Sequence, residues 1–113
     1  MSQTATDTDI DWSDCFEINR NENLKGIRIT MTREKEIILP YIHFSAATLR
    51  EKGTISIQFT SAIVSICYND SFPHEYLLED LQQQRASRIR NNPSRNFEVQ
   101  VQLIESEGQV VPL

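Results

Sequence analysis

Residues 54–91 constrain the fold more than any other part of the chain. The runs 54–59 and 62–68 alternate apolar with polar side chains, and only two residues separate them. Alternation with a period of two puts every second side chain on one face of a sheet, so these runs predict a β-hairpin with an apolar face. Apolar residues at helical spacing follow and predict one long helix over 73–90 that covers this face, with a stripe formed by Leu77, Leu78, Leu81, Ala86 and Ile89.

Further strands are expected on both sides of this segment. Residues 27–31 alternate in the same way, residues 37–39 form a short apolar run, and residues 97–104 show the most regular alternation in the chain. The sequence therefore predicts an α+β fold, an antiparallel β-meander of about four to six strands packed against one long helix, with a final strand after the helix. This order of elements is similar, at the level of fold alone, to curved-sheet-plus-helix modules such as pleckstrin-homology-like domains, and the likeness implies no function.

Residues 45–52 fit either a strand or a helix. Ser45 could cap a helix, and most of the residues that follow it are good helix formers. We favour a strand up to about Thr48, because Gly53 and the charged residues before it then form a hairpin loop into the next strand.

The negative charge is concentrated at the start of the chain. The net charge is −5, and residues 1–24 carry six acidic residues against Arg20 alone, whereas ten basic and ten acidic residues follow. We therefore expect an acidic, flexible tail over 1–23 and a single α+β domain over 24–113. Trp12 is the candidate anchor through which the tail could dock on the domain or on a partner, together with Ile10, Phe16 and Ile18.

Four arginines form the strongest candidate for an anion or partner site. Arg85 and Arg88 would lie on neighbouring turns of the predicted helix, with Arg90 and Arg95 shortly after them. Guanidinium groups at this spacing could hold phosphates or carboxylates, or they could be a solvated helix end that complements the helix dipole. The acidic tail could also fold back and mask them.

A second candidate is the strand over 97–104. It is nearly uncharged, and an exposed sheet edge of this kind invites pairing with another chain. The residues that would form this self-association strand are Phe97, Val99, Val101 and Leu103.

No sequence pattern indicates catalysis, a cofactor or a metal. His43 and His74 belong to no catalytic motif, Cys67 is expected to act as a small hydrophobe in its strand, and the acidic neighbours of Cys15 disfavour its thiolate. We expect a non-enzymatic interaction or regulatory module. It would bind a protein, or its own copy as a homodimer, through a sheet edge or a helix–sheet groove; nucleic-acid or phosphate binding by Arg85–Arg95 is the alternative. The first residues lack a signal-peptide pattern and no apolar run is long enough to span a membrane, so we expect a cytoplasmic protein without a membrane partner.

Overall fold

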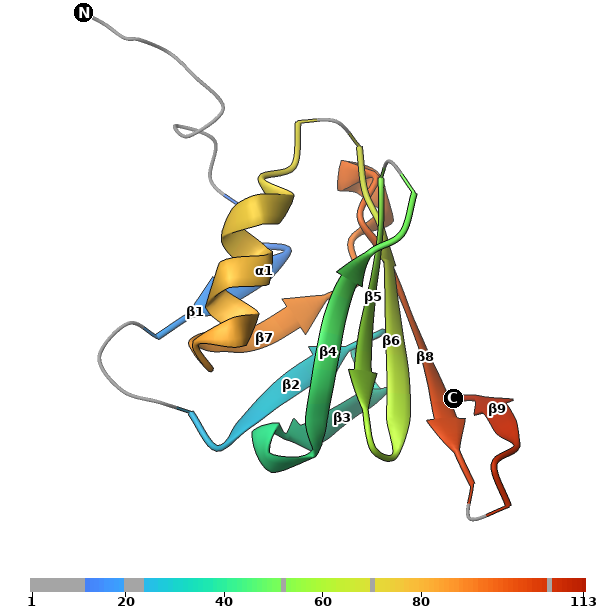
Figure 1. The fold of residues 1–113 in the computed structure, drawn as a ribbon. Coiled ribbons are helices and arrows are strands. Elements are labelled where there is room, and N and C mark those ends of the chain that lie inside the picture. Colours follow the sequence, from blue (N-terminus) through green and yellow to red (C-terminus); the bar gives the residue numbers. More distant parts are fainter. Residues whose placement is uncertain (1–11, 20–23, 52, 70, 106) are drawn as a thin grey trace, which may run out of the picture.

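The computed structural model describes residues 12–19, 24–51, 53–69, 71–105 and 107–113. The described residues form two β-sheets and one α-helix, α1, and Figure 1 shows the sheets crossing one another with α1 beside them. Along the chain the elements are β1 (Phe16–Ile18), β2 (Gly26–Thr30), β3 (Glu36–Pro40), the 3-10 turn η2 (Tyr41–His43), β4 (Phe44–Leu49), β5 (Thr54–Phe59), β6 (Ala62–Cys67), α1 (His74–Gln82), β7 (Ala86–Arg90), the 3-10 turn η3 (Pro93–Arg95), β8 (Glu98–Ile104) and β9 (Val110–Pro112).

The strands form a four-stranded sheet in the order β1-β7-β2-β3 and a five-stranded sheet in the order β4-β5-β6-β8-β9. Every pairing is antiparallel except that of β7 with β2, which is parallel. The predicted fold class, an antiparallel meander with one helix and strand structure after it, is confirmed. The strand preferred for residues 45–52 is also confirmed over the range of β4.

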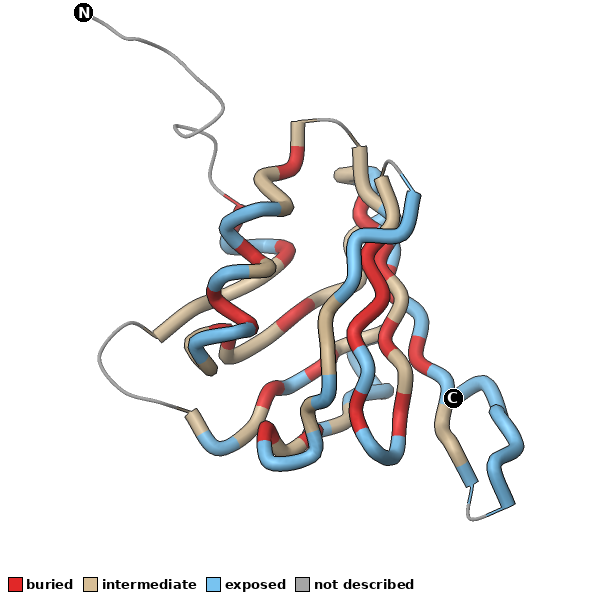
Figure 2. Tube along the Cα trace, in the orientation of Figure 1, coloured by how far each residue is buried: buried red, intermediate tan, exposed pale blue. Residues whose placement is uncertain are grey.

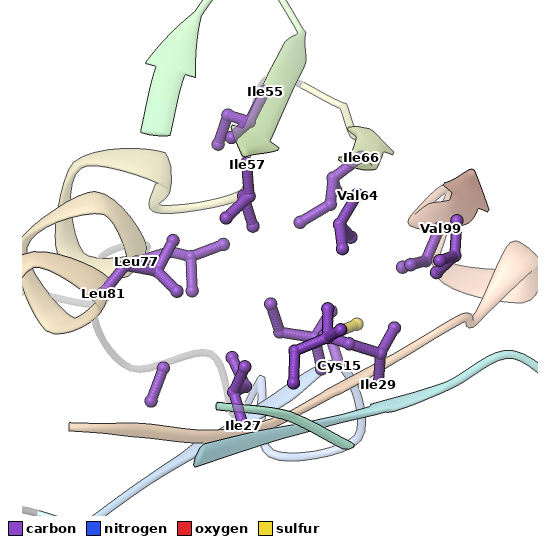
Figure 3. Close-up of a cluster of buried hydrophobic side chains, with 14 of the residues drawn as sticks. Cys15, Ile27, Ile29, Ile55, Ile57, Val64, Ile66, Leu77, Leu81 and Val99 are labelled. Carbon is purple, nitrogen blue, oxygen red and sulfur yellow. The ribbon is translucent and has the colours of Figure 1, made fainter. Parts of the chain in front are cut away.

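The hydrophobic core fills the space between the two sheets and α1 (Figure 3). Ile27 and Ile29 enter it from β2, and Ile55 and Ile57 enter it from β5. From the helix, Leu77 and Leu81 complete it, and both are fully buried. Burying one such side chain contributes about 1.5–3 kcal/mol relative to leaving it in water, so these residues fix how α1 sits against the sheets. Figure 2 shows that the buried residues line the inside, while β9 is exposed along its length.

The helix is shorter than predicted, and the prediction of helix for residues 83–90 is wrong. α1 ends at Gln82 after nine residues, and Ala86–Arg90 is the strand β7. Gln84 adopts a left-handed backbone with φ of 58°, a conformation that ends helices. The carbonyls of Gln84 and Arg85 then accept hydrogen bonds from the N–H groups of Leu24 (2.9 Å) and Asn19 (2.7 Å). Contacts distant in sequence therefore stabilise the turn that ends the helix.

Residues 12–19, here called the amino-terminal arm, are part of the fold. Trp12 is 8% exposed and its ring lies 5.1 Å from that of Phe72 in an edge-to-face arrangement. Phe16 also contacts Phe72, and β1 pairs with β7. The folded unit thus begins upstream of the boundary expected at Leu24. Residues 1–11 and 20–23 lie outside the described part of the chain, and the tail predicted there, with Ile10 in it, stays a prediction.

The burial of the two cysteines differs from what their sequence context predicts. Cys15, expected in a flexible acidic tail, is fully buried, and Cys67, expected to act as a small hydrophobe, is exposed. The reason is the pleat of β6, whose core-facing positions are Ala62, Val64 and Ile66, so that Cys67 points to the other face. Burial, and then the neighbouring Asp14, raise the pKa of Cys15 to about 12.

Candidate functional site

A groove runs between α1 and β4. Its volume is about 540 Å³, and its lining comes from one strand and one face of the helix. The lining residues are Phe44, Ala46 and Ala47 of β4 and Glu75, Leu78, Glu79 and Gln82 of α1. In Figure 1 the helix and the strand run side by side.

The strand side of the groove is a sheet edge. Among the described residues β4 pairs with β5 alone and forms one end of the five-stranded sheet. Arg50 donates its N–H to the carbonyl of Thr54 at 3.0 Å. Because hydrogen-bonded and non-bonded pairs alternate in an antiparallel ladder, Thr48 bonds to β5 and the N–H and C=O groups of Ala47 and Leu49 point outward. The groove therefore contains unpaired backbone donors and acceptors.

The helix side of the groove is positioned by the core. Residues 75, 78, 79 and 82 follow the helical repeat and share one face, next to the face that carries Leu77 and Leu81. Since both leucines are fully buried, α1 cannot rotate without exposing them. Leu78 is partly buried and supplies the apolar part of the helical wall.

The end of α1 is held by a buried polar cluster. Asp80 is 4% exposed, and its Oδ1 lies 3.0 Å from Nη2 of Arg85. Tyr41 donates its hydroxyl to the carbonyl of Ala86 at 2.6 Å, and burial followed by the Asp80 charge raises the pKa of Tyr41. These contacts connect η2, α1 and β7, so the cluster fixes the helix relative to the chain segment that leads into β4.

The groove is acidic. Glu75 and Glu79 are both exposed at its rim, and neither has an ion-pair partner in the described structure. The remaining lining residues are apolar or, in Gln82, neutral. The site thus combines an apolar floor, an open strand edge and two uncompensated carboxylates on the helix.

The four candidate arginines do not lie on one helix face. Arg85 precedes β7, Arg88 and Arg90 belong to β7, and Arg95 lies in η3. Each guanidinium has a carboxylate within 4 Å: Asp80 for Arg85 (3.0 Å), Glu36 for Arg88 (3.9 Å), Glu17 for Arg90 (2.5 Å) and Asp14 for Arg95 (2.7 Å).

Two of these carboxylates, Asp14 and Glu17, come from the amino-terminal arm. The guanidinium carbon of Arg95 also lies 4.2 Å from the centroid of the Trp12 ring, a cation–π geometry. The arm residues thus lie against two of the arginines, and masking by the acidic tail stays a prediction.

The predicted self-association strand, β8, is not a free edge along its length. It pairs with β6 throughout and with β9 over Gln102–Ile104. Two further bonds cover part of the remaining edge: the N–H of Val99 donates to Oδ1 of Asn91, and the N–H of Leu113 donates to the carbonyl of Val101. The side chains of Phe97, Val99 and Val101 are buried in the core, and Leu103 packs against it. The buried side chains of Phe97, Val99 and Val101 are consequently not available to a partner.

The remaining reactive side chains are scattered. His43 is exposed in η2, and His74 stacks on Tyr68 with ring centroids 5.5 Å apart at the start of α1. Within the described ranges no group of three His, Cys, Asp or Glu residues is arranged to hold a metal ion. In the same ranges, no helix has the length and apolar character needed to cross a membrane.

None of the family models, curated proteins and solved structures compared with the chain matches it. What the fold and the groove define is a small α+β protein that presents an unpaired strand edge beside a helix. The sequence predicts a helix–sheet groove as one possible site. It does not predict the lining residues, because they depend on which strand ends the sheet.

Proposed function

We propose that this protein is a non-enzymatic interaction module that binds an extended segment of a partner protein. The segment adds to the open edge of β4 as a further strand and lies in the groove beside α1. The observation that carries the proposal is the groove of about 540 Å³ between a helix fixed by the core and a strand whose outer edge is unpaired. Strand addition next to a helix is a recurrent mode of peptide recognition, because backbone hydrogen bonds give affinity and side-chain pockets give specificity.

The backbone contacts alone would give weak binding. Ala47 and Leu49 offer two N–H and two C=O groups, and a net contribution of about 1 kcal/mol for each hydrogen bond corresponds to a dissociation constant of about 1 mM. Contacts in the groove must supply the remaining free energy of binding. Phe44, Ala47 and Leu78 form the apolar surface that can do so.

Other partners have less support. Self-association through β8 would need an edge that β9, the Asn91 side chain and the Leu113 N–H already cover in part. Phosphate binding by Arg85, Arg88, Arg90 and Arg95 would need guanidinium groups that already have carboxylate neighbours. A second copy of the chain could pair through β4, and the experiment below separates that case. A cytoplasmic location stays a prediction from the sequence, to be checked by cell fractionation.

The proposal is tested by selecting binders from a displayed library of linear dodecapeptides on the immobilised protein. The best binder is then added while amide hydrogen exchange is followed. We expect the amides of Ala47 and Leu49 to become protected, because their N–H groups point to the added strand. If every selected peptide leaves these two amides unprotected, or if no peptide is selected, strand addition at β4 is refuted. Protection that rises with protein concentration without peptide would instead show pairing between two copies of β4, and would also refute it.

A matched pair of variants tests whether the peptide binds at the edge of β4. Ala47→Pro removes an outward-pointing N–H, a change that edge strands tolerate, and it should abolish binding with the fold retained. Val110→Pro makes the same change on the other edge of the sheet, in β9, where the register with β8 also leaves the N–H pointing outward. Val110→Pro should bind peptide normally, and equal loss in both variants would contradict the proposal.

A further inference from the structure

We infer that the partner strand is basic, with Lys or Arg at two positions separated by one residue. The inference rests on the proposed function, since it describes the segment that would lie in the groove beside α1. It follows from the two carboxylates on the helical wall and from their spacing.

The spacing of the carboxylates matches a strand. Glu75 and Glu79 are four residues apart on α1, which corresponds to about 6 Å along the helix axis. Alternate residues of a strand lie about 6.6–6.8 Å apart and point to the same face. Two basic side chains at positions i and i+2 can therefore meet one carboxylate each. Adjacent residues point to opposite faces, and residues four apart lie about 13 Å apart, so neither spacing can engage both.

The floor of the groove suits the stems of such side chains. Lys and Arg carry three or four methylene groups below the charge, and these groups pack on apolar surface while the head stays in water. Leu78 lies between Glu75 and Glu79 along the helix, and Phe44 and Ala47 face it from β4. An added basic side chain can thus cross Leu78 with its stem and reach a carboxylate with its charged group.

Charge also selects among occupants. The lining residues include two carboxylates and no cation, so a basic segment is attracted and an acidic one is repelled. The start of this chain carries Asp7, Asp9 and Asp11 and is therefore a poor occupant of its own groove. The partner we infer is a basic peptide segment of another protein.

The test uses three synthetic peptides of identical composition, labelled at the amino terminus: GTTKTKTTG, GTTKKTTTG and GTKTTTKTG. Threonine favours extended structure, and only the lysine spacing differs. We expect GTTKTKTTG to bind about 1.4- to 5-fold more tightly than each control, as measured by fluorescence anisotropy at low salt, because it can form one more exposed ion pair. Glu79→Gln should remove this preference, whereas Glu98→Gln, an exposed change on β8 outside the groove, should leave it intact.

Charge reversal gives the sharpest check. The double variant Glu75→Lys/Glu79→Lys should lose GTTKTKTTG and gain the acidic peptide GTTETETTG. Equal binding of the three lysine peptides, or an unchanged preference in the double variant, overturns the inference about spacing and charge. Strand addition itself would then still stand if a library-selected peptide protects the amides of Ala47 and Leu49. The two proposals can therefore fail separately.

Discussion

The carboxylate of Asp80 and the guanidinium of Arg85 lie 3.0 Å apart across the turn that joins α1 to β7, and Nε of Arg85 donates a second contact at 3.2 Å. The N–H of Arg85 also donates to the carbonyl of Asp80 at 2.8 Å. This pair holds the last turn of α1 against the start of β7. Since α1 forms one wall of the groove, the geometry of the groove depends on it.

Asp80→Asn should lower the free energy of unfolding by about 1–3 kcal/mol, because it leaves Arg85 without its carboxylate in a partly buried position. The measurement is urea unfolding followed by circular dichroism. Glu79→Gln is the control, since Glu79 is the next residue but is exposed, and its effect should stay within about 0.5 kcal/mol. Similar losses in both variants would show that the buried ion pair has no special role.

Gln84→Gly should stabilise the protein by about 0.4–1 kcal/mol, because a non-glycine residue at φ of 58° is strained and glycine is not. Gln84→Val should do the reverse, since a β-branched residue adopts this conformation poorly. Thermal unfolding of the two variants beside the natural protein gives the comparison. A gain in melting temperature with valine would contradict the assigned turn.

The same turn shows where sequence reasoning reaches its limit. The strands β2, β5, β6 and β8 could be predicted because each alternates strongly. The end of α1 could not, because Gln84 is neither Gly, Asn nor Pro and carries no local stop signal. The turn is closed by local bonds from the N–H groups of Gln84 and Arg85 back into α1, and its carbonyls accept hydrogen bonds from Leu24 and Asn19, about 60 residues away in the chain. The spacing of three between Ala86 and Ile89 fits a helix and not the period of two of a strand, and the pairing of β7 with β1 and β2 overrides it.

Trp12→Ala should destabilise the protein by about 3 kcal/mol or more, because it removes a buried aromatic ring that contacts Phe72 and Arg95. Trp12→Phe should cost clearly less, since it keeps an aromatic ring and the buried Nε1 of Trp12 has no hydrogen-bond partner to lose. Chemical denaturation gives both values. An alanine variant as stable as the natural protein would show that the amino-terminal arm does not contribute to folding.

The two thiols should react at very different rates. Cys67 is exposed and should react promptly with a disulfide reagent at pH 8, whereas Cys15 is buried with its pKa raised to about 12 and should react only after unfolding. Cys67→Ser should then abolish the fast phase, and Cys15→Ser should leave it. A fast phase that survives in Cys67→Ser would contradict the burial of Cys15.

The pKa of Cys15 also predicts a loss of stability at alkaline pH. Its folded pKa lies above its unfolded value of 9.0, so between about pH 9 and pH 12 the unfolded state binds fewer protons than the folded state. Its contribution to stability is complete below pH 9 and declines as the pH rises through this range. Cys15→Ala should be less stable overall but should lose less on going from pH 8 to pH 10.5, and an equal decline in both proteins would contradict the assignment.

Val101→Lys should act on stability and not on association. Val101 is 4% exposed and faces the core from β8, so a lysine there buries an unpaired charge. We expect the free energy of unfolding to fall by about 3 kcal/mol or more. Gln100→Lys is the neighbouring control, because this residue is exposed and points to the opposite face. If Val101→Lys folds normally and changes only the size seen by light scattering, β8 is an interface after all.

The sequence predicts a groove of this kind but not its position in the fold. An amphipathic helix over a sheet leaves a groove along the helix, and the sequence indicated both elements. Which edge the groove follows depends on the strand order, and that order depends on β8 pairing with β6 and thereby leaving β4 at the end of the sheet. Pairings between residues 31 to 41 positions apart leave no trace in local periodicity, so Ala47 and Leu78 could not be singled out.

The pairing of β1 with β7 has a consequence for how the chain is made. Among the described strands β1 pairs with β7 alone, and its partner residues leave the ribosome about 70 residues later. Until then the hairpin of β2 and β3 and the meander of β4, β5 and β6 can form, while Trp12 and Phe16 have no completed cluster to enter. Of the described strands β1 is therefore made before its partner and incorporated late, and a nascent chain halted before β7 would expose two aromatic side chains to chaperones.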